Sequence, residues 1–137
     1  MCSILLVEDH KIMAETLARV LRTKGNFTVA DVAESAEDAL EWLSEHPVEQ
    51  QVDLALVDVV LPRTSGIELV SIIQQKYPGL PCLMISARSA GQYVKRSLAA
   101  GARGYVLKDD LQEVMKGIRR VLEGGTYLSE QISEGEN

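Results

Sequence analysis

The chain has 137 residues, 46% of them apolar and 25% charged, which are the proportions of a soluble globular protein of one domain. Its 14 basic and 20 acidic residues give a formal charge of -6, so the chain as a whole is expected to be repelled by nucleic acid and by anionic membranes. No apolar stretch approaches the roughly 20 residues that span a bilayer, and the start lacks the basic residues of a signal segment, so we expect a cytoplasmic protein.

Short apolar runs and amphipathic segments alternate along the chain. Five runs have the length and composition of buried strands, and they cover residues 4–7, 27–32, 54–57, 82–85 and 105–107. After each run, apolar residues recur at helical spacing, over residues 13–21, 36–43, 69–73, 94–98 and 114–122. Ser35, Ser65 and Asp110 each precede a helical segment and are followed three residues later by an acid, which is the pattern of a helix N-cap.

This alternation predicts an α/β fold. Five βα units joined by right-handed crossovers give a doubly wound, five-stranded parallel sheet with helices on both faces. The flavodoxin-like (βα)5 order 2-1-3-4-5 suits five strands and puts strands 1 and 3 at the topological switch point. The composition turns polar after Gly124, so we expect a domain over residues 1–124 and a linker or tail over residues 125–137.

Cys2 and Cys82 begin two strands that the predicted order separates by a third strand. Their Cα atoms would then be too far apart for a disulfide, so we expect two reduced thiols.

Four of the predicted strands end on side chains suited to phosphate chemistry. Glu8 and Asp9 follow the first strand, Asp58 the third, Ser86 the fourth and Lys108 the fifth. Because ligands of such sheets bind at the carboxyl ends of the strands, we expect these side chains to share one pocket. At ~5 Å and an effective dielectric constant near 20, two carboxylates repel each other by roughly 3 kcal/mol, so three of them need a counter-charge such as Mg²⁺ or Mn²⁺. Capping of the following helix is the alternative role for Asp9.

The residues at these strand ends also form motifs. Phosphoryl transfer to a carboxylate requires a nucleophile, a metal ion and a cation near the phosphate oxygens, and this set of side chains can supply them. In order over residues 3–122, the motifs resemble the receiver domain of two-component response regulators. They are Leu5-Leu6-Val7-Glu8-Asp9, Leu56-Val57-Asp58-Val59-Val60-Leu61-Pro62 with Gly66, Met84-Ile85-Ser86-Ala87 and Gly104-Tyr105-Val106-Leu107-Lys108.

The resemblance implies a role for each residue of the pocket. Asp58 would accept a phosphoryl group from a histidine kinase, and Lys108 would pair with that group. The metal ion would be held by Glu8, Asp9 and Asp58, with the backbone carbonyl of Val60 completing the protein ligands.

The resemblance also implies a switch. Ser86 would move toward the phosphoryl group, and Tyr105 would turn inward as it does so. Phosphorylation adds nearly two negative charges at one point, which can draw a hydroxyl group inward. The surface of the fourth helix, fifth strand and fifth helix would then change and carry the signal. Val60 and Arg88 flank the expected path of the hydrolytic water, so we expect both to tune the lifetime of the phosphorylated state, Arg88 by reaching or shielding the phosphoryl oxygens.

Other features concern the neighbours of this domain. Asp109 follows the lysine where the family often has a proline in a cis bond, so we expect a trans bond here, or a strained cis one. The Lys108-Asp109 pair and residues 125–129 are similar to the subgroup whose receivers precede a helix-turn-helix effector. We therefore expect the receiver of a longer transcription regulator, whose DNA-binding effector lies outside this sequence.

His10 and Lys11 are expected to face solvent, and no chemistry is assigned to them.

Alternative functions stay open at this point. A phosphorelay intermediate, which passes phosphate to a second histidine protein, would use the same chemistry. A phosphatase typically carries a second acid two residues past the nucleophile, where this chain has Val60. A flavin carrier would place its phosphate near Glu8 and Asp9, which would repel it, and a pure docking domain is disfavoured because no residue for phosphotransfer is missing. We expect no enzyme activity beyond the chain's own phosphorylation and slow dephosphorylation, and a C₂ pair if the protein forms a homodimer.

Overall fold

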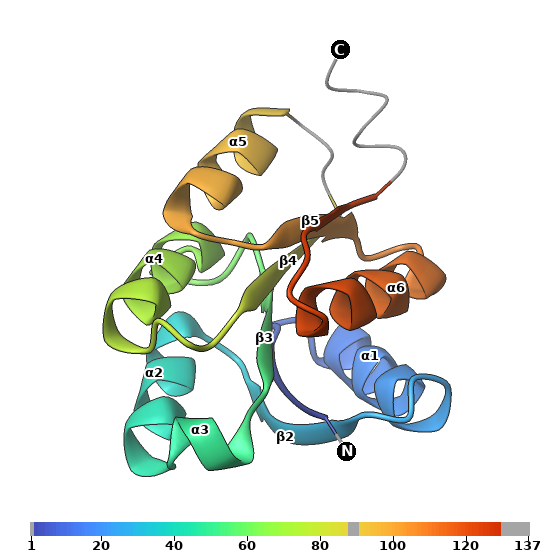
Figure 1. Ribbon diagram of the computed structural model, residues 1–137, viewed down its shortest axis with the longest axis horizontal. Coiled ribbons are helices and arrows are strands. Elements are labelled where there is room, and N and C mark those ends of the chain that lie inside the picture. The colour runs from blue at the N-terminus through green and yellow to red at the C-terminus, as the bar shows by residue number, and fades with distance from the viewer. Residues whose placement is uncertain (1, 88–90, 130–137) are drawn as a thin grey trace.

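The computed structural model describes residues 2–87 and 91–129 and shows strands and helices in alternation (Figure 1). None of the helices in this part of the chain is long and apolar enough to cross a membrane. In chain order the elements are β1 (Ser3–Val7), α1 (Lys11–Thr23), β2 (Thr28–Ala33), α2 (Ala36–Glu45), α3 (Val48–Gln51), β3 (Leu54–Asp58), α4 (Gly66–Lys76), β4 (Cys82–Ser86), α5 (Gly91–Ala100), β5 (Gly104–Leu107), α6 (Leu111–Leu122) and β6 (Tyr127–Leu128).

All the strands pair in parallel within one sheet, in the order β2-β1-β3-β4-β5-β6. Helices α1 and α6 cover one face, and α2, α4 and α5 cover the other (Figure 1). The predicted doubly wound architecture and the order 2-1-3-4-5 are confirmed, and β6 is added at the outer edge of β5. The carboxyl ends of β1 and β3 therefore lie side by side at the centre of the sheet.

The strands are apolar throughout because both of their faces are buried. In β1, Ile4 and Leu6 pack in the cluster under α1 and α6, whereas Leu5 and Val7 pack in the cluster on the opposite face. All four side chains are fully buried. A strand enclosed in this way has no solvent-facing positions. Its sequence is therefore a continuous apolar run, which stops at the end of the strand.

The predicted N-caps are confirmed at three helices. The hydroxyl of Ser35 accepts a hydrogen bond from the backbone N–H of Asp38 at 3.0 Å, and Ser65 accepts one from Glu68 at 3.1 Å. Asp110 accepts the equivalent bond from Glu113 at 3.1 Å. Each bond satisfies a backbone donor that has no partner within its helix, which fixes where the helix begins.

The predicted strand ranges each differ by a residue from the observed ones, and β2 is shifted at both ends. Strand β2 begins at Thr28, because Phe27 is buried and its N–H donates to the carbonyl of Leu21 at 2.9 Å, closing the turn after α1. The one-turn helix α3 was not predicted. It begins after Pro47, whose carbonyl accepts from Gln51 N–H at 3.1 Å, so this proline starts a helical turn as well as ending α2.

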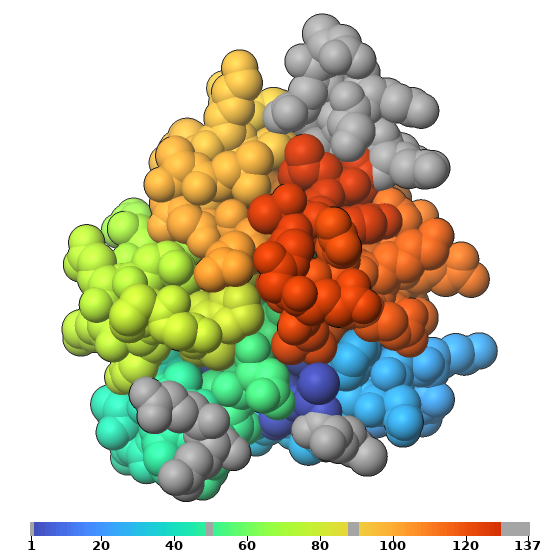
Figure 2. All heavy atoms as spheres, in the orientation of Figure 1, coloured from blue at the N-terminus to red at the C-terminus, as the bar shows by residue number. Residues whose placement is uncertain are grey.

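The stretch predicted as a linker or tail stays packed on the sheet as far as Ser129. Strand β6 pairs with β5, and the Ser129 N–H donates to the carbonyl of Tyr105 at 3.2 Å. The buried Ser129 hydroxyl in turn accepts from the Leu107 N–H at 3.2 Å. Figure 2 shows this end of the chain, in red, covering the middle of one face beside α5 and α6. The edge of β5 is therefore not exposed at these residues.

Candidate functional site

Three strand ends bring oppositely charged side chains into contact at the carboxyl edge of the sheet. Glu8 follows β1, Asp58 ends β3 and Lys108 follows β5, and their exposed fractions are 1%, 2% and 9%. The Lys108 Nζ donates to Glu8 Oε1 and to Asp58 Oδ2, at 2.8 Å in each case. The sequence placed these residues in one pocket, but it did not indicate that one lysine would bridge the two carboxylates.

Burial and contact shift the protonation of these groups in different directions. Burial raises the pKa of Asp58 to about 6, and the nearby Glu8 carboxylate adds to this rise, while Lys108 opposes it. Burial also favours protonated Glu8, but its hydrogen bonds with Lys108 and Asp58 prevail and bring the pKa of Glu8 below its usual range. The pKa of Lys108 is raised because its bonds to Asp58 and Glu8 outweigh the effect of burial. Asp58 is thus the carboxyl of the pair that holds a proton more readily.

The carboxylates lie close enough to share a cation. One ligand atom from each of Glu8, Asp9, His10 and Asp58 lies within 4.8 Å of the other three. Asp9 is exposed at the mouth of the site, and its oxygen donors complement the buried oxygens of Glu8 and Asp58. Carboxylate oxygens in this number are the donors that Mg²⁺ and Mn²⁺ prefer, so the residues fit a hard divalent ion.

The loop after β3 holds Asp58 in place. The Val60 N–H donates to Asp58 Oδ1 at 3.2 Å, while the Val60 side chain is 52% exposed. A Cβ at Gly66 would overlap the carbonyl oxygen of Asp58, so only glycine lets the start of α4 approach this closely. The role of the Val60 carbonyl as a metal ligand stays a prediction. The sequence motif contained Gly66 but did not show the contact that requires it.

A cavity of about 550 Å³ opens directly onto Asp58. Ser86, at the end of β4, is buried and lines this cavity together with Ala87 and Lys108. The opposite wall is formed by the first turns of α1, where the Ile12 side chain is 81% exposed. Arg88, which was predicted to tune the phosphorylated state, lies outside the described residues. The cavity gives an incoming group access to the carboxylate.

Tyr105, the expected switch residue, lies in the interior of the sheet. Its side chain is fully buried and packs in the cluster formed with α2, α4 and α5. It pairs with Met84 of β4 and with Leu128 of β6, so β5 is an interior strand at this position. The peptide bond between Lys108 and Asp109 is trans, since no bond among the described residues is cis.

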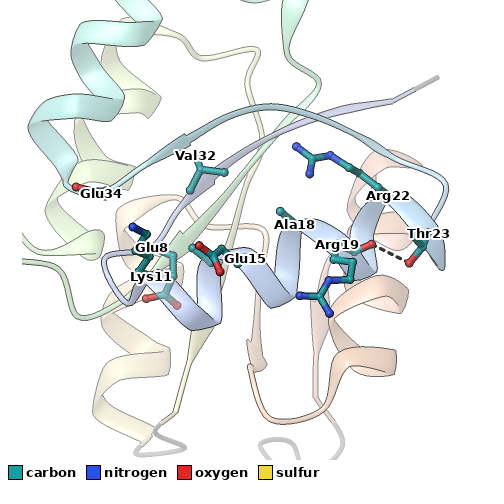
Figure 3. A pocket seen from close by; sticks show the side chains of 10 residues that line it. Glu8, Lys11, Glu15, Ala18, Arg19, Arg22, Thr23, Val32 and Glu34 are labelled. Carbon is teal, nitrogen blue, oxygen red and sulfur yellow. Dashed lines mark hydrogen bonds between the residues drawn. The ribbon is translucent and has the colours of Figure 1, made fainter.

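A second cavity, of about 590 Å³, lies between α1 and β2 (Figure 3). Glu8 borders it, but Asp58 and Lys108 do not. Charged side chains of both signs surround it, among them Lys11, Glu15 and Arg22 (Figure 3). This cavity therefore meets the carboxylate cluster only at Glu8 and does not reach Asp58.

Comparison with known proteins gives consistent matches over nearly the whole chain. Residues 4–119 match the family model of the response regulator receiver domain. The chain is 28% identical to the transcriptional regulatory protein DegU of Brevibacillus brevis and 30% identical to the transcriptional regulatory protein MctR of Rhizobium johnstonii. These matches cover 95% and 94% of this chain but 54% and 59% of the relatives, so the chain spans less than two thirds of their length.

A solved structure of another protein has the same fold over almost all of this chain. It is a two-component response regulator of the LuxR family from Aurantimonas sp., and it superposes with a TM-score of 0.89 at 27% identity. The superposition covers 98% of this chain and 94% of that one.

Proposed function

This chain belongs to the family of response regulator receiver domains, and on that basis we propose that it is a signalling switch whose phosphoacceptor is Asp58. A histidine kinase would supply the phosphoryl group. The observation that supports this most directly is the contact of buried Asp58 with both Glu8 and Lys108 beside an open cavity. An acid in this position combines a nucleophilic oxygen with a fixed cation, which is what transfer to a carboxylate requires.

We further propose that Glu8, Asp9 and Asp58 hold Mg²⁺ or Mn²⁺, with the carbonyl of Val60 as the expected backbone ligand. The cluster of oxygen atoms within 4.8 Å of one another supports this assignment. When bound, the ion would neutralise charge on the carboxylates and on the phosphate oxygens.

The chain's own side chains would carry out the transfer. A carboxylate oxygen of Asp58 would attack the phosphorus of the kinase phosphohistidine, so that an O–P bond forms while the N–P bond breaks and its electron pair stays on the imidazole. Lys108, now 2.8 Å from Asp58 Oδ2, would remain as the cation beside the new phosphoryl group. The Ser86 hydroxyl, which lines the same cavity, would donate a hydrogen bond to a phosphoryl oxygen.

The signal would leave the site through β4 and β5. The fourth helix, fifth strand and fifth helix of the sequence prediction correspond to α5, β5 and α6 of the structure. Ser86 pairs with Leu107 in the sheet, and Tyr105 lies two residues earlier on the same strand. A shift of Ser86 would therefore act on the packing of buried Tyr105. We propose that this surface controls a DNA-binding effector domain of a longer protein, in the cytoplasm.

The assignment of Asp58 can be tested by intact mass. The protein would be incubated with Mg²⁺ and a small phosphodonor, and compared with Asp58→Asn. Asp109→Asn is the matched control, because Asp109 is an exposed acid next to Lys108 and carries the same charge change. We expect one added phosphoryl group in the wild type and in the control and none in Asp58→Asn. A gain of mass that does not depend on Asp58 would contradict the proposal.

The lifetime of the phosphorylated state is assigned to the residues around the cavity. Val60 lines the cavity, and Arg88 follows Ala87 in the sequence. We propose that both tune the lifetime of the phosphorylated state, Arg88 by slowing hydrolysis, and that the chain has no enzyme activity beyond its own phosphorylation and dephosphorylation. An unchanged dephosphorylation rate in Arg88→Ala would remove Arg88 from this assignment.

A further inference from the structure

The imidazole of His10 lies at the exposed side of the acidic cluster, and its side chain is 71% exposed, so it faces solvent as the sequence suggested. Its Nδ1 is 3.4 Å from Glu8 Oε2 and 3.5 Å from Asp9 Oδ1. Two ligands at right angles around an ion with bonds of ~2.1 Å lie about 3 Å apart, so these three atoms are close to the spacing of neighbouring ligands. The His10 side chain also lines the cavity that opens onto Asp58.

The backbone of His10 is hydrogen-bonded to the acidic cluster, whereas its side chain does not cap the helix. Its N–H donates to Glu8 Oε2 at 3.1 Å, which ties the residue to the cluster. His10 is the N-cap residue of α1, but its side chain makes no capping hydrogen bond. Within the described part of the chain, the polar contacts of its ring are with the carboxylates of Glu8 and Asp9. The ring is therefore placed to act on whatever the carboxylates bind.

Lys108 limits the number of oxygen atoms that the carboxylates can offer to a metal ion. It occupies Glu8 Oε1 and Asp58 Oδ2, so an ion would meet the second oxygen of each group, which also accepts one backbone N–H, and the carboxylate of Asp9. Three carboxylates and one ammonium group sum to a charge of about -2 when all are ionised, which a divalent ion balances. A neutral nitrogen donor adds a ligand without disturbing this balance.

We propose that His10 is a further protein ligand of the metal ion, through Nδ1, and that it biases the site toward Mn²⁺ over Mg²⁺. This inference rests on the proposed metal site and concerns which ion that site selects. Mg²⁺ keeps oxygen ligands and several waters, whereas imidazole nitrogen suits transition metals. A site with carboxylates and one imidazole therefore discriminates between the two ions more strongly than a site with carboxylates alone.

The test uses the two histidines of the chain as variant and control. His10→Ala and His10→Gln remove the nitrogen donor, and Gln keeps a polar side chain of similar reach. His46→Ala is the matched control, because His46 stacks on Trp42 at 4.2 Å and its Nδ1 lies 2.8 Å from the Trp42 carbonyl, which occupies it at the end of α2. Titration calorimetry of the whole chain with Mg²⁺ and with Mn²⁺, at one alkaline pH, gives the ratio of the two affinities.

We expect the His10 variants to bind Mn²⁺ about tenfold more weakly, with Mg²⁺ affinity changed much less, and His46→Ala to match the wild type. Electron spin echo spectroscopy of the Mn²⁺-loaded protein, with and without ¹⁵N-histidine, should show nitrogen coupling that His10→Ala abolishes and His46→Ala retains. Mn²⁺ binding without nitrogen coupling, or an unchanged affinity ratio in both His10 variants, would overturn the role of His10 alone. Failure of the wild type to bind either ion would overturn the proposed metal site itself.

Discussion

Asp58 is a buried acid whose ionisation weakens the fold, so removing its charge should stabilise the protein. Its exposed fraction is 2%, and burial raises its pKa from 3.8 to about 6. Between these two values the folded chain holds a proton that the unfolded chain has lost, so stability falls as the pH rises through this range. Glu8 has a lowered pKa and acts in the opposite sense, but only below its ordinary value of 4.5.

The size of the effect follows from the two pKa values. Each pKa unit is worth about 1.4 kcal/mol, so a rise from 3.8 to about 6 corresponds to roughly 3 kcal/mol above the upper value. Asp58→Asn keeps the shape of the side chain and leaves Lys108 paired with Glu8. We therefore expect the variant, without metal ion, to gain roughly 1 to 3 kcal/mol of unfolding free energy at about pH 8, and about half as much at about pH 5.

Urea denaturation at these two pH values, followed by fluorescence of Trp42, measures the gain. Asp109→Asn is the control, because it removes one exposed negative charge from the same end of the sheet. Saturating Mg²⁺ should raise the stability of the wild type more than that of Asp58→Asn, and so narrow the difference between them. If Asp58→Asn were no more stable than the control at about pH 8, or if its gain did not change with pH, the electrostatic reasoning would be refuted.

Three further predictions concern close packing and burial within the fold. Gly66→Ala should lower the unfolding free energy by roughly 2 to 4 kcal/mol, because the new methyl group would overlap the backbone of Asp58. Gly91→Ala is the control and should be neutral or slightly stabilising, because a Cβ at Gly91 would have no atom within 4 Å. Equal urea midpoints for the two variants would contradict this prediction. Ser129→Ala should cost roughly 1 to 2 kcal/mol, because it leaves a buried N–H of β5 without its acceptor, and chemical denaturation measures the loss. Burial raises the pKa of the Cys82 thiol to about 12, so a thiol reagent should modify half-buried Cys2 well before Cys82 in the folded protein, and equal rates would argue against this burial.

Much of the fold could be predicted because the strands carry their signal in consecutive residues. β3 is buried along its whole length, so its apolar run ends at Asp58, where the structure ends the strand. The N-caps at Ser35, Ser65 and Asp110 were equally clear, since each is a local pattern of two residues. Strand β2 was placed one residue early because it lies at the edge of the sheet, where the periodic signal is weak.

Other features could not be read from local patterns. β6 has two residues, and its pairing with β5 depends on where the chain returns after α6. The full burial of Tyr105 follows from this pairing, which makes β5 an interior strand. His10 is exposed, as the sequence suggested, but only the turn between β1 and α1 places its ring beside the carboxylates.

The charged residues at the carboxyl edge of the sheet could be identified from sequence alone, because a strand buried on both faces ends where charged side chains begin. The sequence therefore identified Glu8, Asp58 and Lys108 as neighbours. The pairing of these charges, in contrast, depends on the folded chain. Glu8 and Lys108 are 100 positions apart, and Asp58 and Lys108 are 50 apart. Such contacts depend on the order of the strands and on side-chain positions to within a few tenths of an ångström, which no periodicity in the sequence encodes. They determine the pKa of Asp58 and which oxygen atoms can bind a metal ion.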